Sequence, residues 1–245
     1  MGTLNLEKLI DFSKSLDANE VDNLKYKLFL MAMDELNNSQ NPKETILLDK
    51  ESNANVILES LVRIQPYSNR IKDFGLAFKG RPSFMTDDLV NSLIKESEEF
   101  KLQAKSNFNQ YIYQVETLND ETISEKFANS LDLLDLVTLH AGPVIPSFIT
   151  SYIYYFNEGN DSKPHVDNAF TSVTVMVGLK QDYPIEINNE PSSSFIYWAN
   201  RRPFHYRLLP GEIAIFFGSS VIHGRTPLKK GESVNSLLVS FRPSL

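Results

Sequence analysis

The chain contains no cysteine. That absence excludes a disulfide framework, a thiolate zinc site and a cysteine nucleophile, so any bound metal must be held by nitrogen and oxygen ligands. No apolar run approaches the ~18 residues of a membrane-spanning helix, and the N-terminus lacks the charged and apolar segments of a signal peptide. We therefore expect a protein of the cytoplasm that has no membrane partner.

Positive charge is also scarce. The 24 lysines and arginines are outnumbered by 31 aspartates and glutamates, which gives a formal net charge of -7 at pH 7. A protein that binds a nucleic-acid backbone needs a basic surface, so this balance argues against a nucleic-acid partner. It favours a small-molecule substrate. The oligomeric state stays open, with a homodimer among the alternatives.

The 245 residues, 42% of them hydrophobic, are enough to bury a sizeable core, and we expect a single domain over residues 1–245. In the first part, about residues 1–80, apolar residues recur at three- and four-residue spacing. This pattern predicts helices near residues 6–10, 21–31 and 56–64. The polar break at residues 37–42 contains a proline and is interpreted as a loop, not as a domain boundary.

The second part, about residues 81–245, changes to strand periodicity. Thr86 and Thr122 are the predicted N-caps of two helices. Around and after them, β-branched and aromatic residues fill short segments separated by turns such as Leu209-Pro210-Gly211. The predicted strands are residues 111–115, 151–156, 171–179, 194–198, 206–208, 212–217 and 236–241. Short strands in this order, preceded by helices, predict a mainly β fold: a double-sheet jelly roll with the N-terminal helical additions packed on one sheet.

The segment Lys163-Pro164-His165-Val166-Asp167 has the clearest chemistry. Side chains two apart on a strand point to the same face, so His165 and Asp167 can reach one cation. His223 follows Asp167 by 56 residues (223 minus 167), just past an apolar segment at residues 213–217. Two histidines and one carboxylate on one side of a metal, with the other positions open, form the facial site of non-haem Fe(II) oxygenases. The alternative is that both histidines are structural.

This layout resembles the Fe(II)/2-oxoglutarate-dependent dioxygenase superfamily over about residues 80–245. The sharpest parts are Tyr154-Tyr155-Phe156-Asn157-Glu158-Gly159 before the His165–Asp167 pair, and Pro210-Gly211-Glu212 before His223-Gly224-Arg225-Thr226-Pro227. The resemblance implies a single catalytic domain with a double-stranded β-helix, and Fe(II), 2-oxoglutarate and O2 as cofactor and cosubstrates. It also implies hydroxylation of an unactivated C–H bond with release of succinate and CO2. Related halogenases have Gly or Ala where this chain has Asp167, so hydroxylation is favoured over halogenation, while desaturation, ring formation and other oxidations stay open as alternatives.

In the resembled superfamily, an arginine or lysine on the strand after the distal histidine binds 2-oxoglutarate. The usual position, about ten residues past His223, is Ser233 in this chain. We favour Arg242, which shares a strand face with Ser236, Leu238 and Ser240, and keep Arg225 as the second candidate.

The resemblance also places Tyr154 and Phe156 against 2-oxoglutarate, with core packing as the alternative. Asn168, Trp198 and Asn235 are the candidate substrate contacts.

The substrate class is the least determined property. Small bacterial oxygenases that hydroxylate free amino acids or natural-product intermediates, including relatives of halogenases, are similar in size and in their helical N-terminal part. We therefore expect a small-molecule substrate. The alternatives are oxidative hydroxylation or demethylation of a protein or nucleic acid by the same superfamily, and a non-catalytic, cupin-like metal-binding module.

Overall fold

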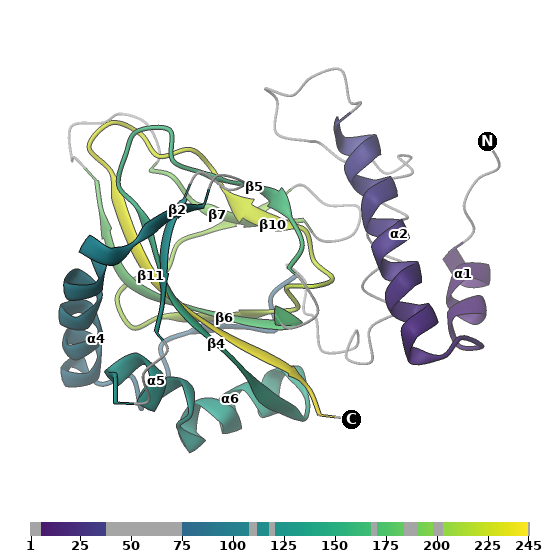
Figure 1. The fold of residues 1–245 in the computed structure, drawn as a ribbon, viewed down its shortest axis with the longest axis horizontal. Helices are drawn as coiled ribbons and strands as arrows, with labels where there is room; N and C mark the ends of the chain where they lie inside the picture. The colour runs from purple at the N-terminus through teal and green to yellow at the C-terminus, as the bar shows by residue number, and fades with distance from the viewer. Residues whose placement is uncertain are drawn as a thin grey trace.

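Two antiparallel sheets face each other in the computed structural model, which describes residues 6–37, 75–107, 112–117, 121–167, 171–183, 191–197 and 203–244. The strand order is β1-β9-β6-β11-β4-β3-β2 in the larger sheet and β5-β10-β7-β8 in the smaller. This is the predicted jelly roll (Figure 1). The strands are β1 Phe78–Gly80, β2 Lys105–Asn107, β3 Ile112–Glu116, β4 Val144–Tyr155, β5 Ser162–His165, β6 Val173–Asp182, β7 Ser194–Ile196, β8 Phe204–Tyr206, β9 Ile213–Phe216, β10 His223–Arg225 and β11 Ser233–Pro243.

Three helices lie against the larger sheet: α4 (Asp87–Phe100), α5 (Ile123–Ala128) and α6 (Leu131–Ala141) (Figure 1). A short 3-10 turn, η2 (Lys101–Gln103), follows α4. The side chains of Thr86 and Thr122 accept hydrogen bonds from Leu89 N and Glu125 N, which confirms both as N-caps.

The predicted helices of the N-terminal part have different outcomes. Two of them are present as α1 (Leu6–Ser13) and α2 (Ala18–Asn37), which lie beside the two sheets in Figure 1. The third, at residues 56–64, lies outside the described residues. The helices on the sheet therefore come from the segment between residues 87 and 141.

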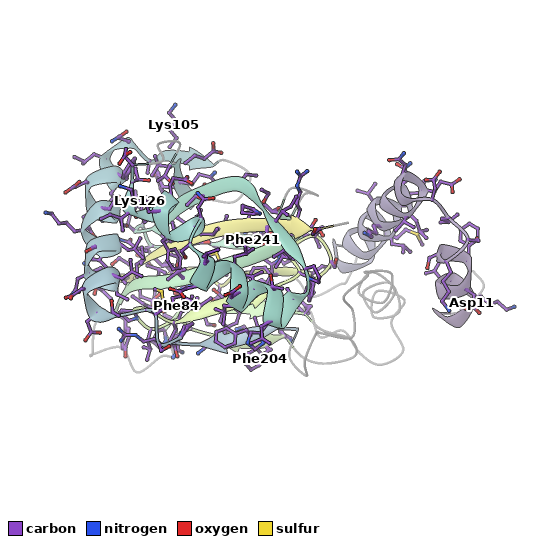
Figure 2. The ribbon with its side chains drawn as sticks, turned by 90° about the horizontal axis from the view of Figure 1, so that it is seen from below. Asp11, Phe84, Lys105, Lys126, Phe204 and Phe241 are labelled. Atoms are coloured by element: carbon purple, nitrogen blue, oxygen red, sulfur yellow. The ribbon has the colours of Figure 1, made fainter. Side chains whose placement is uncertain are left out.

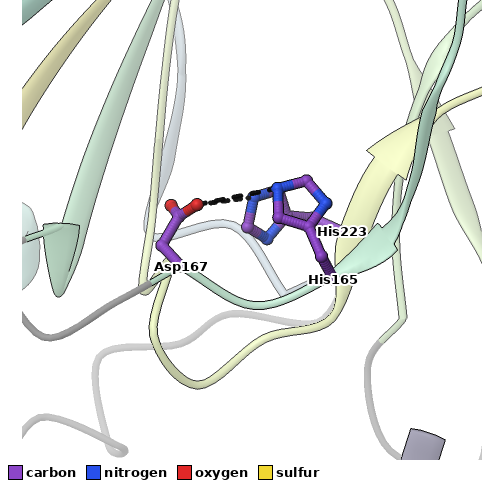
Figure 3. Close-up of side chains that lie close together, drawn as sticks. All are labelled: His165, Asp167 and His223. Carbon is purple, nitrogen blue, oxygen red and sulfur yellow. Dashed lines mark ion pairs between the residues drawn. The ribbon is translucent and has the colours of Figure 1, made fainter. Parts of the chain in front are cut away.

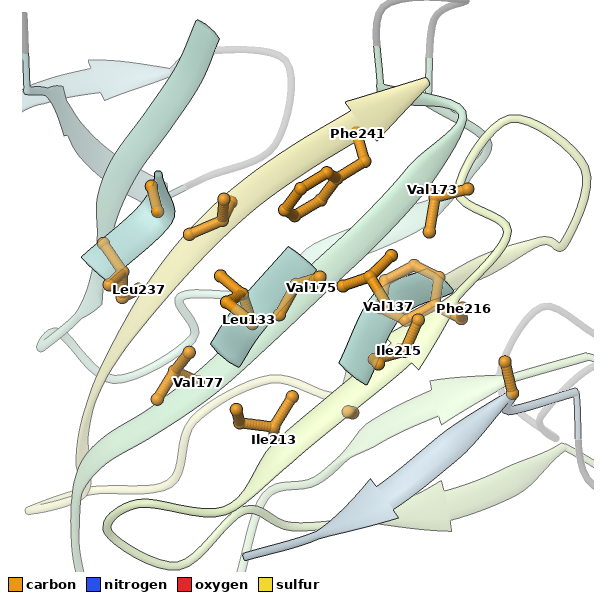
Figure 4. Close-up of a cluster of buried hydrophobic side chains, with 14 of the residues drawn as sticks. Leu133, Val137, Val173, Val175, Val177, Ile213, Ile215, Phe216, Leu237 and Phe241 are labelled. Atoms are coloured by element: carbon orange, nitrogen blue, oxygen red, sulfur yellow. The ribbon is translucent and has the colours of Figure 1, made fainter. Parts of the chain in front are cut away.

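The hydrophobic core fills the space between the larger sheet and its helices. Figure 4 shows this cluster, and Figure 2 shows Phe241 within the body of the sheets and Lys105 at its margin. Nine buried residues of this layer, each less than 2% exposed, are Leu133, Val137, Val173, Val175, Val177, Ile213, Ile215, Leu237 and Phe241, whereas Phe216 faces the cavity on the other side of the sheet. Because neighbouring side chains on a strand point to opposite faces, the residues between the core positions point to the other side of the sheet. On β6 those residues are Thr174 and Met176.

The direction of the faces on β4 is set by hydrogen bonds to α4. The Tyr152 hydroxyl donates to Glu96 Oε1 at 2.7 Å, and the Tyr154 hydroxyl donates to the Ser97 carbonyl at 2.7 Å. The even-numbered residues of this part of β4 therefore face the helices. The odd-numbered residues, including Tyr155, face the space between the two sheets.

Glu96 joins α4, α5 and β4 through one buried carboxylate. It accepts hydrogen bonds from the backbone of Ile123 at 2.6 Å, from the backbone and hydroxyl of Ser124 at 3.0 and 2.6 Å, and from Tyr152. Burial raises the pKa of Glu96, but these hydrogen bonds outweigh burial and hold the pKa below its ordinary value. The ionised form therefore stabilises the fold at neutral pH.

We predict that Glu96→Ala lowers the free energy of unfolding by about 3 kcal/mol at pH 7, because it leaves buried donors without an acceptor. A depressed pKa gives stability that is present above the pKa of the unfolded chain and is lost as pH falls through the folded pKa. The difference in the free energy of unfolding between wild type and Glu96→Ala should therefore decrease below about pH 4. Urea denaturation at several pH values measures both effects.

The matched control is Glu99→Ala, on the exposed side of the same helix. It should change the free energy of unfolding by less than about 0.5 kcal/mol. Equal effects of the two substitutions would contradict the role assigned to Glu96.

Candidate metal centre

The three predicted ligands lie together between the sheets. His165 ends β5 and His223 begins β10, and the two are direct partners in the antiparallel register. Asp167 Oδ1 lies 3.6 Å from His165 Nε2 and 3.5 Å from His223 Nε2 (Figure 3). One ligand atom from each residue fits within 4.8 Å of the others, as needed to share one ion. Strand pairing thus brings together residues that are far apart in the sequence.

Both histidines are oriented by their own strands. His165 Nδ1 lies 2.7 Å from the carbonyl of Lys163, and His223 Nδ1 lies 2.9 Å from the carbonyl of Val221. A carbonyl only accepts, so each Nδ1 carries a hydrogen, and in the neutral ring Nε2 keeps the lone pair. Hydrogen bonds of this kind fix the orientation of metal-binding histidines in proteins. Both Nε2 atoms are thereby presented to the same point beside Asp167.

Asp167 is fixed through its other oxygen. The Thr174 hydroxyl donates to Asp167 Oδ2 at 2.6 Å, and the Asp167 amide donates to the Gly218 carbonyl at 2.8 Å. Gly218 is packed so closely that a Cβ there would overlap Asp167 Oδ2 and the Thr174 hydroxyl. Oδ2 is therefore engaged with the protein, and Oδ1 faces the histidines as a single oxygen ligand.

The charges of His165 and Asp167 suit a cation, whereas the raised pKa of His223 means that a cation competes with a proton for this ring. Burial lowers the pKa of His165 to about 4, helped by the neighbouring His223 and opposed by Asp167, so this ring is neutral at pH 7. Burial raises the pKa of Asp167, but the adjacent histidines outweigh it and hold that pKa below its ordinary value. Burial lowers the pKa of His223, and Asp167 reverses this, so its pKa is raised. A neutral nitrogen and an ionised oxygen are the ligand forms of these groups.

This donor set fits iron(II). Two imidazole nitrogens and one carboxylate oxygen lie on one side of a common point, which is the arrangement of non-haem iron oxygenases. The two Nδ1 atoms and Oδ2 are already engaged, so each residue offers one ligand atom. These three residues would hold an iron ion by three ligand atoms, which would leave coordination positions for other ligands.

A cavity of about 470 Å³ adjoins the three residues and is large enough for small molecules. Its wall on the larger sheet is formed by Gln114 and Glu116 of β3, Ile149, Ser151, Ile153 and Tyr155 of β4, Thr174 and Met176 of β6, Phe216 of β9, and Leu238 of β11. Ser162, Ser194, Tyr206 and Arg225 also line it. The cavity therefore joins the metal centre to a polar group of residues on the smaller sheet.

Arg225 is a buried cation in this cavity. It lies two residues after His223 on β10 and is 6% exposed. Its Nη1 donates to the Ser194 hydroxyl at 3.2 Å, and its guanidinium carbon lies 5.3 Å from the centre of the Tyr155 ring. Its Nε and Nη2 have no hydrogen-bond partner among the described residues. Those two N–H groups form one edge of the guanidinium, which can bind a carboxylate in two places at once.

The other predicted 2-oxoglutarate contacts do not line the cavity. Arg242 is exposed near the end of β11. Tyr154 is on the helix side of β4, where its hydroxyl binds the Ser97 carbonyl. Phe156 stacks on Tyr113 with 4.3 Å between ring centres. The aromatic residue of this segment that does line the cavity is Tyr155.

Of the predicted substrate contacts, the described residues include Asn235, and it does not line the cavity. Asn235 is 3% exposed, and its Nδ2 donates to Glu98 Oε1 at 3.1 Å, so it faces α4. Asn168 and Trp198 lie outside the described residues. Sequence reasoning did not single out Thr174, Gly218 or Ser194. Strand periodicity could have assigned Thr174 to one of the two faces of β6. No local sequence pattern identified which of these faces reaches Asp167.

We predict that Thr174→Val weakens metal binding about 10- to 100-fold, because the hydroxyl that fixes Asp167 is lost at nearly constant shape. Thr174→Ser keeps the hydroxyl and should bind nearly as tightly as wild type. Titration of the metal-free protein with Co(II), followed by its visible absorption, gives the affinity and reports the ligand geometry. If Thr174→Val and the wild type had the same affinity and the same spectrum, Thr174 would not have the role of orienting Asp167.

Comparisons with known proteins identify the fold. No protein-family model matches the chain, and no curated protein matches its sequence. Among the described residues, no helix is both long and apolar enough to cross a membrane. A Pseudomonas putida prolyl-4-hydroxylase has a TM-score of 0.54 and 14% identity, covering 77% of this chain and 100% of its own.

Two further solved structures have a similar fold. The non-haem, alpha-ketoglutarate-dependent epimerase SnoN from nogalamycin biosynthesis has a TM-score of 0.57 and 14% identity, covering 76% of this chain and 82% of its own. A 2OG-Fe(II) oxygenase family oxidoreductase from Burkholderia pseudomallei has a TM-score of 0.55 and 10% identity, covering 76% and 90%. The chain therefore has the double-stranded β-helix fold of 2-oxoglutarate- and Fe(II)-dependent oxygenases.

Proposed function

We propose that the protein is an Fe(II)- and 2-oxoglutarate-dependent oxygenase that hydroxylates an unactivated C–H bond of a small molecule, with release of succinate and CO2. One observation carries this proposal. The His165, Asp167 and His223 donor set opens into the same cavity as the unpaired edge of the buried Arg225 guanidinium. A site for a metal and a site for a carboxylate are what an oxo acid bound to iron requires.

Each residue has a defined part in this reaction. His165 Nε2, Asp167 Oδ1 and His223 Nε2 would hold Fe(II), which when bound supplies the oxygen chemistry that consumes 2-oxoglutarate. Arg225 binds the distal carboxylate of 2-oxoglutarate, while Ser194 holds the guanidinium in place.

Arg225 replaces Arg242 as our preferred 2-oxoglutarate anchor. Arg242 is exposed and outside the cavity, and Arg225 is buried within it. Leaving a guanidinium buried with two unpaired N–H groups is costly, so the site favours an anionic ligand. Tyr155, whose ring lies beside the Arg225 guanidinium, takes the place against 2-oxoglutarate that the family resemblance implied for Tyr154.

A small-molecule substrate is supported by the net charge of -7, which provides no broad basic surface for nucleic acid. The fold itself leaves the substrate open, since its structural neighbours include both a prolyl-4-hydroxylase and an epimerase of nogalamycin biosynthesis. Asp167 occupies the carboxylate position of the facial set, and this supports hydroxylation over halogenation. A cupin-like module without 2-oxoglutarate gives no reason for the unpaired edge of Arg225.

We predict that protein reconstituted anaerobically with Fe(II) forms succinate from 2-oxoglutarate once oxygen is admitted. A pool of free amino acids and small metabolites should increase the rate, and Asp167→Ala should reduce it more than about 100-fold, since losing a ligand costs more than losing its hydrogen-bond partner. Failure of both iron and 2-oxoglutarate to bind would overturn the oxygenase. Metal binding without any 2-oxoglutarate binding would indicate the cupin-like module.

Substitution of the two arginines tests the anchor. Arg225→Gln should raise the KM for 2-oxoglutarate about 100-fold, because a buried charge-assisted pair is lost. Arg242→Gln is the matched control, and its KM should stay within about twofold of wild type. Steady-state succinate formation measures both. The reverse order of effects would return the anchor to Arg242.

A further inference from the structure

The part of the cavity wall formed by β3 carries a carboxylate that the reaction described above does not use. Glu116 and Asp167 are the carboxylates among the described cavity-lining residues, and Asp167 belongs to the metal centre. Glu116 is the direct register partner of Ser151 on β4. Ser151 is 2% exposed, and its hydroxyl has no hydrogen-bond partner among the described residues. An exposed carboxylate thus lies beside a buried, unpaired hydroxyl on this wall of the cavity.

An apolar strip continues from these two residues across the sheet. Ser151 pairs with Leu238 of β11, and Leu238 pairs with Met176 of β6. All of them line the cavity. Three strand spacings of about 4.8 Å separate Glu116 from Met176, which is about 14 Å along the sheet. The row therefore changes from anionic at one end to apolar at the other.

The apolar end of the row adjoins the metal centre. Met176 is two residues after Thr174 on the same face of β6, and Thr174 binds Asp167 Oδ2. A molecule placed along the row has one end near the metal and the other near Glu116. Arg225, the cation of the cavity, is assigned to the carboxylate of 2-oxoglutarate. The negative charge of Glu116, on the wall formed by β3, is then available to bind the substrate.

We propose that Glu116 and Ser151 form the recognition site for a basic nitrogen of the substrate, and that the substrate is an aliphatic amine. Glu116 supplies the opposite charge, and both side chains supply oxygen acceptors for the ammonium N–H groups. Leu238 and Met176 contact the aliphatic part and direct its far end to the metal centre. This assignment rests on the proposed function and adds the substrate class to it.

The test uses three probes of equal length and different charge: n-pentylammonium, 1-pentanol and pentanoate. Their binding to the full chain is measured by ligand-observed NMR, with Zn(II) as a redox-inert ion at the N/O ligands. Saturating 2-oxoglutarate occupies Arg225, so that pentanoate cannot bind there. We expect n-pentylammonium to bind at least about tenfold more tightly than the other two, because it alone gains a charge-assisted contact.

Substitution then locates the bound probe. Glu116→Gln should weaken n-pentylammonium binding about tenfold or more, and Ser151→Ala should weaken it less, while 1-pentanol is little affected by Glu116→Gln. Glu99→Gln, at an exposed carboxylate of α4, controls for general attraction of cations to an acidic protein and should have no effect. Absence of n-pentylammonium binding, equal binding of the three probes, preference for pentanoate, or insensitivity to Glu116→Gln each overturns the proposal.

A wild-type measurement separates this inference from the proposed function. Succinate formation and 2-oxoglutarate binding by the same wild-type preparation do not depend on the three probes. If succinate forms and 2-oxoglutarate binds but n-pentylammonium does not bind, the proposed amine site is wrong and the proposed oxygenase function is retained. If neither is present, the oxygenase itself is wrong.

Discussion

The opposite orientation of neighbouring side chains on β4 decides which residues of the larger sheet can act in the cavity. Tyr152 and Tyr154 donate hydrogen bonds to α4, and this fixes one face of the strand against the helices. Ser151 and Tyr155 must then face the cavity. A shift of one residue would exchange the two faces, burying polar hydroxyls away from their acceptors on α4. The helices on the outside of the sheet thereby control the composition of the site on its inside.

The ligands of the metal centre are also held in one orientation by the surrounding protein. In each ligand residue, the polar atom that does not face the shared ion position already has a hydrogen-bond partner. His165 and His223 are each oriented by a carbonyl of their own strand, and Asp167 is oriented by Thr174. Gly218 leaves the space that this arrangement needs. The ligands are therefore ordered when the chain folds, and ion binding does not have to order them.

Charge is distributed unevenly over the cavity. Asp167 is ionised beside two histidines, Arg225 is buried with an unpaired edge, and Glu116 lies on the wall formed by β3. The low dielectric around the buried Arg225 strengthens the effect of its charge on a ligand, whereas Glu116 is exposed at the cavity wall. In the proposed assignments, a divalent ion, an oxo acid and an amine would each meet a complementary group, and exchanging their places would bring like charges together. The cavity therefore favours one orientation of its ligands.

Local patterns were enough to predict the helix caps at Thr86 and Thr122, the short strands and the shared face of His165 and Asp167, because each depends on residues near one another in the chain. It also indicated His223, through the apolar strand that precedes it. Only the folded chain shows that Arg225 lines the cavity and Arg242 does not, and that Tyr155 lines it in place of Tyr154. Strand periodicity defines two faces but not which one is covered by helices, and that choice depends on contacts between residues far apart in the sequence.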